Sequence, residues 1–209
     1  MGAKNLLLII LGSHGALVSR ALEQLGLRAF MYGEIVSALL KGLNELSSPE
    51  RDETQKSVLK VNHQGHPTRT VGLTELENGV TRIPMEYGVL YIPKVENFPL
   101  VDGFFFLNSP RNTLVGLQMT TAGAHHTITS TVKQFTECLA AYFEGWDELS
   151  RDMSWETIYV QHAASKMITK WQRYDVVNTD IVSEKEKEIA WFWKEKVRQY
   201  QVSILSRDF

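Results

Sequence analysis

Two polar residues on neighbouring β-type segments have the side-chain types and spacing to bind a divalent cation. Asp102 ends the segment Pro99-Leu-Val-Asp102, and Gln118 lies two residues before Thr120 in the next β-type run. Neighbouring strands would bring their two oxygen ligands to one Mg²⁺, and a lysine would position or activate the attacking water. Asp102 and Gln118 are therefore the expected metal ligands, and Asp102, Gln118 and Lys133 are the expected catalytic residues.

This set of residues lacks charged side chains that a metal-dependent nuclease would carry. Gln118 is a neutral oxygen ligand, and Thr120 supplies no positive charge where a metal-dependent nuclease would carry a lysine. Asp102 also has a simpler interpretation, as a turn residue at the edge of a strand. Four other side chains could complete a site, namely Lys133 or Gln134 on the following helical segment and a carboxylate from Glu86 or Glu96.

The histidines are weaker candidates. His125 and His126 follow the third β-type run, in a loop position that often lines sites in α/β proteins. Adjacent histidines cannot easily bind one metal, so a solvated pair is the simpler interpretation. His63 and His66 have no cysteine nearby, which indicates a solvated turn rather than zinc. His162, at the end of an apolar run, is expected to be a hydrogen-bonded residue at the edge of the core.

Composition excludes several classes of protein. The 209 residues carry a formal charge of −2, so no overall basic field indicates nucleic acid or an anionic membrane as partner. The single cysteine, Cys138, excludes an internal disulfide and fits a reducing intracellular compartment. The apolar run Leu6 to Leu11 is too short to span a bilayer, so no membrane contact is expected. Gly12-Ser-His-Gly15 lacks the ending of a phosphate-binding loop.

Hydrophobic periodicity predicts an α/β fold. Residues 16–46 read as two or three helices, and residues 47–84 read as a polar connector with one short helix. The later segments are predicted as strands at 87–92, 101–107, 114–120 and 155–162 and helices at 132–143 and 183–200. The five residues between the second and third strands predict an antiparallel hairpin, and a helical crossover then leads to a parallel strand.

The same pattern predicts two regions and a core. Residues 1–84 are expected to be an N-terminal helical region with its connector, and residues 85–209 an α/β domain with a mixed sheet flanked by helices. One continuous core is expected from the apolar faces of these elements, comprising Val101, Phe105, Leu114, Leu117, Phe135, Leu139, Ile158, Val160, Ile189 and Trp193.

A strand meander with an acidic residue on its second strand, followed by a crossover, resembles the restriction-endonuclease-like fold. Longer runs of the sequence resemble trypanosomatid retrotransposon hot spot proteins in their C-terminal region. The runs are Met85-Glu-Tyr-Gly-Val-Leu-Tyr91, Val95-Glu-Asn-Phe-Pro-Leu-Val-Asp-Gly-Phe-Phe-Phe106, Leu114-Val-Gly-Leu-Gln-Met-Thr-Thr121, Gln134-Phe-Thr-Glu-Cys-Leu-Ala-Ala-Tyr142 and Ile158-Tyr-Val-Gln-His162.

This resemblance implies a multigene family of intracellular proteins of the nucleus or cytoplasm. Full-length members carry an upstream P-loop nucleotide-binding region, so the chain is expected to be a C-terminal fragment or a truncated copy. Similar domains occur in Crinkler-type effectors, where they are thought to act on nucleic acid. Their third-strand pattern of Gln, any residue and Thr followed by His matches Gln118, Thr120 and His125 or His126.

Two functions remain in competition. The first is a Mg²⁺-dependent nuclease that uses Asp102, Gln118 and Lys133. The second, which the incomplete set of charges favours, is a non-catalytic module that associates with nucleic acid or with a chromatin-associated protein. Convergence of Asp102, Gln118 and a lysine around one cavity would favour the nuclease.

Overall fold

The computed structural model describes residues 15–49, 51, 54–74, 82–95, 97–175 and 184–204. The apolar run at 6–11, Glu96 and the start of the helix predicted at 183 lie outside these residues. Seven strands form one mixed sheet in the order β1-β9-β7-β5-β4-β3-β2. The strands are β1 (Asn44–Glu45), β2 (Arg69–Leu73), β3 (Val89–Pro93), β4 (Gly103–Leu107), β5 (Thr113–Met119), β7 (Ser154–His162) and β9 (Val197–Ile204).

The β4–β5 hairpin is antiparallel, as the short turn between its strands predicts. Its register pairs Gly103 with Leu117 and Leu107 with Thr113. After β5 the chain crosses over through α5 (Thr129–Tyr142), and β7 then pairs parallel with β5, as expected. Strands β2, β3, β5, β7 and β9 therefore run in one direction, whereas β1 and β4 run in the other. An α/β fold with a mixed sheet is confirmed.

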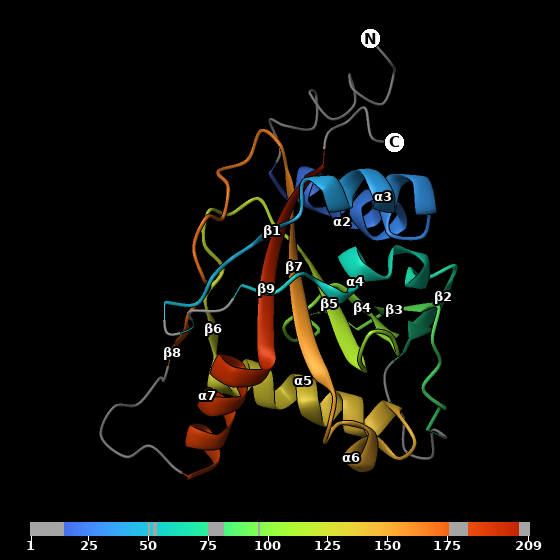
Figure 1. Ribbon diagram of the computed structural model, residues 1–209, viewed down its shortest axis with the longest axis vertical. Helices are drawn as coiled ribbons and strands as arrows, with labels where there is room; N and C mark the ends of the chain where they lie inside the picture. The colour runs from blue at the N-terminus through green and yellow to red at the C-terminus, as the bar shows by residue number, and fades with distance from the viewer. Residues whose placement is uncertain are drawn as a thin grey trace.

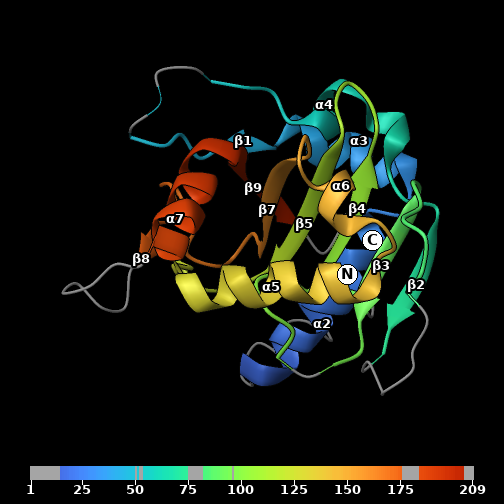
Figure 2. The same ribbon diagram turned by 90° about the horizontal axis from the view of Figure 1, so that it is seen from below.

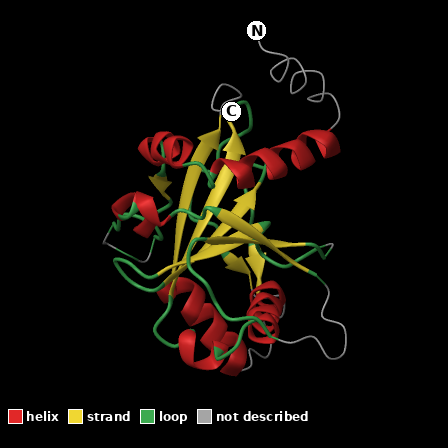
Figure 3. Ribbon diagram, turned by 90° about the vertical axis from the view of Figure 1, so that its right-hand side faces the viewer, coloured by secondary structure: helices red, strands yellow, loops and turns green. Residues whose placement is uncertain are grey.

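Helices cover the two faces of the sheet in separate groups. Figure 1 shows α2 (Gly15–Ala29) and α3 (Gly33–Lys41) gathered at one end, and α5, α6 (Trp146–Leu149) and α7 (Glu184–Lys196) at the other. In Figure 2 α5 crosses the strands, with α7 beside one of its ends. Figure 3 shows the strands between these two groups of helices. Two short helices, α4 (Val58–Val61) and η1 (His63–Gly65), and a two-stranded ribbon of β6 (Thr127–Ile128) and β8 (Tyr174–Asp175) complete the fold.

The core has two layers, so the prediction of one continuous core was wrong. Phe105, Leu117, Ile158 and Val160 pack under α2 and α3. The other predicted core residues lie on the opposite face, against α5 and α7: Val101, Leu114, Phe135, Leu139, Trp193 and the partly buried Ile189. Successive side chains of a strand point to opposite faces, so a sheet covered on both sides separates its apolar residues into two layers.

Two of the longer elements differ from the prediction. The last helix ends at Lys196, and residues 197–204 form β9, which pairs parallel with β7 along eight residues. Val197 and Tyr200 are three residues apart, a spacing that also suits a helix, and pairing with β7 decided the outcome. The connector contains a strand, β2, that pairs parallel with β3. Its sequence, Arg69-Thr-Val-Gly-Leu73, has too few apolar residues to indicate a strand.

The N-terminal region packs closely on the rest of the described chain. Helices α2 and α3 share the first core layer with β4, β5, β7 and β9, and β2 belongs to the same sheet as the later strands. Among the described residues, no helix has the length and the apolar composition needed to cross a membrane.

Candidate functional site

The β4–β5 hairpin brings two of the predicted site residues into contact. Asp102 directly precedes β4, and its backbone N–H donates to the carbonyl of Leu117 at 2.9 Å. Its side-chain Oδ2 accepts two hydrogen bonds from β5, one from Gln118 Nε2 at 3.2 Å and one from the backbone N–H of Met119 at 2.5 Å. The amide of Gln118 therefore presents a donor to Asp102, so the oxygens of the two side chains do not converge as metal ligands would.

The Asp102 carboxyl is harder to ionise than an ordinary aspartate. Its pKa is raised to about 6: burial raises it most, the hydrogen bond from Met119 lowers it, and the negative charge of Glu23 also raises it. Burial disfavours the charged form because protein solvates a carboxylate less well than water does. Asp102 is thus a carboxyl group whose charge depends on pH in the physiological range.

Asp102 lines a cavity of about 1110 Å³. The wall comes from residues of α2 and the following turn between positions 23 and 32, from Thr70 of β2, and from β3 and the segment between positions 90 and 102. The cavity lies beside the carboxyl end of β3, a place where α/β proteins commonly bind ligands. Gly103 permits this arrangement, because a Cβ atom there would lie 2.6 Å from Cδ2 of Leu27 in α2.

Among the residues that the structure describes, four charged side chains line this cavity. Glu23 lies one helical turn before Leu27, and its charge acts on Asp102. The two cations are Arg28, in the last turn of α2, and Lys94, directly after β3. The stem of Lys94 lies over Gly72, where a Cβ atom would be 2.9 Å from Lys94 Cε. Glu23, Arg28 and Lys94 were not singled out from the sequence, although the position of Lys94 at the end of a strand was a usable signal.

The segment that leads to Asp102 contains two residues in the left-handed region, of which Asn97 lines the cavity. Asn97 has a φ of 56° and Leu100 a φ of 72°. Asparagine adopts this conformation readily, whereas for leucine it costs about 1–3 kcal/mol and persists only where the surroundings enforce it. Leu100 packs against the second core layer, which holds the chain in this turn just before Asp102.

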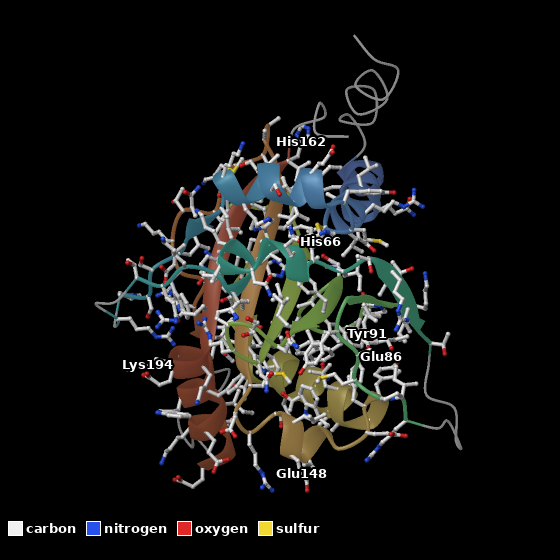
Figure 4. The ribbon with its side chains drawn as sticks, turned by 45° about the vertical axis from the view of Figure 1, so that its right-hand side comes forward. His66, Glu86, Tyr91, Glu148, His162 and Lys194 are labelled. Carbon is white, nitrogen blue, oxygen red and sulfur yellow. The ribbon has the colours of Figure 1, made fainter. Side chains whose placement is uncertain are left out.

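The structure does not bring Lys133 to the Asp102–Gln118 pair. Lys133 lies on α5, where its Nζ is 3.7 Å from Oε1 of Glu137, and it is not among the residues that line the cavity. Glu86, a suggested additional carboxylate, pairs with Arg69. Its backbone N–H donates to Oη of Tyr91 at 3.0 Å, and these two residues lie side by side in Figure 4. Thr120 accepts a hydrogen bond from the backbone of Ala122.

The histidines lie elsewhere. His125 packs near Tyr159, with ring centroids 6.1 Å apart, and its backbone donates to Gln172. Burial, and then the neighbouring His126, lowers the pKa of His125, which keeps its imidazole neutral. His162 lies at the end of β7 and accepts a hydrogen bond from the backbone of Ala164, as expected for a core-edge residue. Figure 4 places His162 at the end of the molecule near α2 and α3.

Comparisons of the chain with protein-family models, with curated proteins and with solved structures found no match. Within the described residues there is no group of three or more His, Cys, Asp and Glu side chains arranged to hold a metal ion. The described site is a cavity with one partly buried, internally hydrogen-bonded carboxyl group, a second carboxylate and two cations. These groups can bind a polar ligand through charge and hydrogen bonds.

Proposed function

We propose that the chain is the C-terminal region of a trypanosomatid retrotransposon hot spot protein and that it serves as a non-catalytic nucleic-acid-binding module with a restriction-endonuclease-like core. The order of elements supports this proposal: helices, the meander β3-β4-β5, the crossover helix α5 and the parallel strand β7. This order is the layout that the sequence resemblance implies for the family.

The observation that carries the non-catalytic assignment is the contact between Gln118 and Asp102. A metal-dependent nuclease needs oxygen ligands that converge on a hard cation. Here Gln118 Nε2 and the Met119 N–H donate to Oδ2 of Asp102, which orients the pair for an internal hydrogen bond. The pair therefore fits Mg²⁺ poorly, and no step of a hydrolysis is assigned to it.

Binding of nucleic acid is supported by the cavity beside this pair. Its cations Arg28 and Lys94 suit phosphate groups, and Tyr32, which is 60% exposed, offers an aromatic ring. The proposed setting is intracellular, in the nucleus or the cytoplasm. A chromatin-associated protein and the upstream P-loop region of full-length family members are proposed as additional partners.

Binding and cleavage assays on the purified chain test the function. Labelled single- and double-stranded DNA and RNA oligonucleotides should bind in EDTA without any need for Mg²⁺, with affinity that falls as salt rises because phosphate contacts release counterions. The oligonucleotides should remain intact in Mg²⁺. Failure to bind any of them at low salt would contradict the proposal and favour a protein-interaction module.

A second candidate function, a Mg²⁺-dependent nuclease, has one observation in its favour. Asp102, Glu23 and Lys94 line the same cavity, so two carboxylates and a lysine are available there. Cleavage that requires Mg²⁺ and is lost in Asp102→Ala would establish this alternative. Asp147→Ala removes an exposed carboxylate from α6 and serves as the matched control.

A further inference from the structure

The cavity beside Asp102 presents side chains of both charges to a ligand. Glu23 and Asp102 supply two carboxyl groups, and Arg28 and Lys94 supply two cations. A ligand that fills this cavity therefore meets both carboxyl groups and cations.

The carboxyl group of Asp102 can accept hydrogen bonds from a ligand. Within the described residues, both hydrogen bonds to its side chain end on Oδ2. The other oxygen, Oδ1, receives no hydrogen bond from those residues, so at the cavity that Asp102 lines it can accept one from a ligand. A hydrogen bond to a charged acceptor contributes more than one between neutral groups, so this oxygen selects for a ligand that carries an N–H group.

Tyr32 supplies an aromatic surface at the same cavity. It is held by its backbone, since its N–H donates to Ala29 at 3.4 Å and its carbonyl accepts from Val36 at 2.9 Å. It is the N-cap residue of α3, yet its side chain is 60% exposed. An exposed aromatic ring on a fixed backbone can stack on a planar group such as a nucleobase.

Lys94 has a defined position opposite β2. Its stem lies over Gly72 and occupies space that the side chain of a larger residue at position 72 would need. Contact along the stem limits the freedom of the side chain and so reduces the entropy lost when the ammonium group binds an anion. Together with Arg28 it provides a place for a phosphate group.

We infer that this cavity binds one nucleotide, with its phosphate at Lys94 and Arg28, its base on Tyr32 and an exocyclic amino group donating to Oδ1 of Asp102. The inference rests on the proposed nucleic-acid-binding function and goes beyond it by assigning the recognising residues and the preferred bases. The volume of about 1110 Å³ has ample room for a nucleotide. Bases with an amino group are preferred to bases that present a carbonyl oxygen there, because a carboxylate repels that oxygen.

Two matched pairs of mononucleotides test the preference by calorimetric titration at pH 7.5 with inorganic phosphate as a further probe. CMP and UMP differ in an amino group and a carbonyl oxygen, and AMP and IMP differ in the same way. CMP and AMP should bind about tenfold more tightly than their partners, as one charge-assisted hydrogen bond predicts. Equal affinities within both pairs would overturn the assignment of Asp102, as would phosphate alone binding as tightly as CMP.

Three variants locate the ligand. Tyr32→Ala and Lys94→Ala should each weaken CMP binding about tenfold. Asp102→Asn, which replaces Oδ1 with an amide donor, should remove the preference for CMP over UMP. The matched controls are Tyr87→Ala, at a tyrosine 44% exposed outside the cavity, and Lys41→Ala, at the exposed end of α3. Equal effects of Tyr32→Ala and Tyr87→Ala would place the ligand elsewhere and overturn the inference.

The same variants test this inference independently of the proposed function. They also distinguish binding of a free nucleotide from binding of a nucleotide within a strand. Oligonucleotides that bind the native chain and all three variants alike would leave the module a nucleic-acid binder and overturn the nucleotide cavity. Mononucleotides that bind as predicted while no oligonucleotide binds would support the cavity and contradict the proposed function. Circular dichroism and thermal melting of each variant confirm that the fold is retained.

Discussion

Two carboxyl groups on the same sheet, Glu156 and Asp102, have different surroundings. Glu156 is the third residue of β7 and is 1% exposed. It accepts hydrogen bonds from Ser57 Oγ at 2.6 Å, from the backbone of Val58 at 2.9 Å and from Arg111 at 3.2 Å. Both of its oxygens are used within the protein.

Asp102, by contrast, accepts hydrogen bonds from the described residues on one oxygen alone, and it lines a cavity. Burial raises the pKa of both groups. The difference teaches that a raised pKa alone does not distinguish a structural carboxyl group from a ligand-binding one, whereas the number of internal donors does. Glu156 joins α4 to the sheet, and Asp102 can accept a ligand.

The largest effect is expected for Glu156→Ala. This change leaves Ser57 and Val58 without their acceptor in a buried site and leaves Arg111 without its ion-pair partner. The free energy of unfolding should fall by about 3–5 kcal/mol, measured by urea denaturation. A loss below about 1 kcal/mol would mean that Glu156 does not hold α4 to the sheet. Glu156→Gln keeps one acceptor and should cost less.

Leu139→Ala provides a reference from a site without charges. Leu139 is fully buried on α5, as the helix prediction requires. Removing its side chain should lower the free energy of unfolding by about 2–5 kcal/mol, because apolar burial is lost and a cavity remains. The measurement is urea denaturation monitored by circular dichroism. An unchanged midpoint would contradict the position of α5 on the sheet.

Asp102→Asn should raise the free energy of unfolding at high pH, whereas the two preceding substitutions lower it. The folded-state pKa of Asp102, about 6, lies above the unfolded value near 3.9, so the folded protein binds more protons between these values. Its stability therefore falls as pH rises from about 4 through 6. The variant lacks this penalty and should be more stable than the native chain by about 1–3 kcal/mol at pH 8, with no gain at pH 4.

This pH dependence of the free energy of unfolding is expected at Asp102, the one of the two carboxyl groups that lines the cavity. Urea denaturation of both proteins at several pH values measures it. A difference between native and variant chains that stays constant from pH 4 to pH 8 would mean that Asp102 has an ordinary pKa.

The smallest effect is expected for Arg111→Ala. The Arg111 side chain is 33% exposed, so water already screens part of its interaction with Glu156. The loss should be about 1 kcal/mol, since Ser57 and Val58 continue to donate to Glu156. Removal of the positive charge should also raise the pKa of Glu156 further, because Arg111 favours its ionised form. Urea denaturation at pH 5 and pH 8 measures both changes.

Local sequence patterns predicted most of the described fold from residue 85 onward. Short runs of apolar, β-branched and aromatic residues located β3, β4, β5 and β7, and the short turn after Leu107 predicted the antiparallel hairpin. The spacing of Val132, Phe135 and Leu139 located α5. These patterns are informative because each element must present an apolar face to the core, and its period depends on the backbone geometry.

Long-range pairing decided the elements that were missed. β2 forms because its backbone pairs with β3, and its few apolar residues carried no signal of that pairing. β9 forms because β7 offers an unpaired edge beyond α7, although residues 197–200 also suit a helix. Propensity is a weak preference that backbone hydrogen bonds within a sheet can override.

The candidate site, like the fold, was determined partly by local sequence and partly by tertiary packing. The sequence alone determined that Asp102 and Gln118 would meet, because a five-residue turn places them on adjacent ends of one hairpin. It did not determine that the Gln118 amide would donate to Asp102, that Lys133 would pair with Glu137, or that Glu23, Arg28, Tyr32 and Lys94 would surround a cavity. The Lys133–Glu137 pair is local to α5, whereas the cavity joins segments far apart in the chain. Only the packing of α2 on the hairpin and of β2 beside β3 brings them together, and no local period encodes that packing.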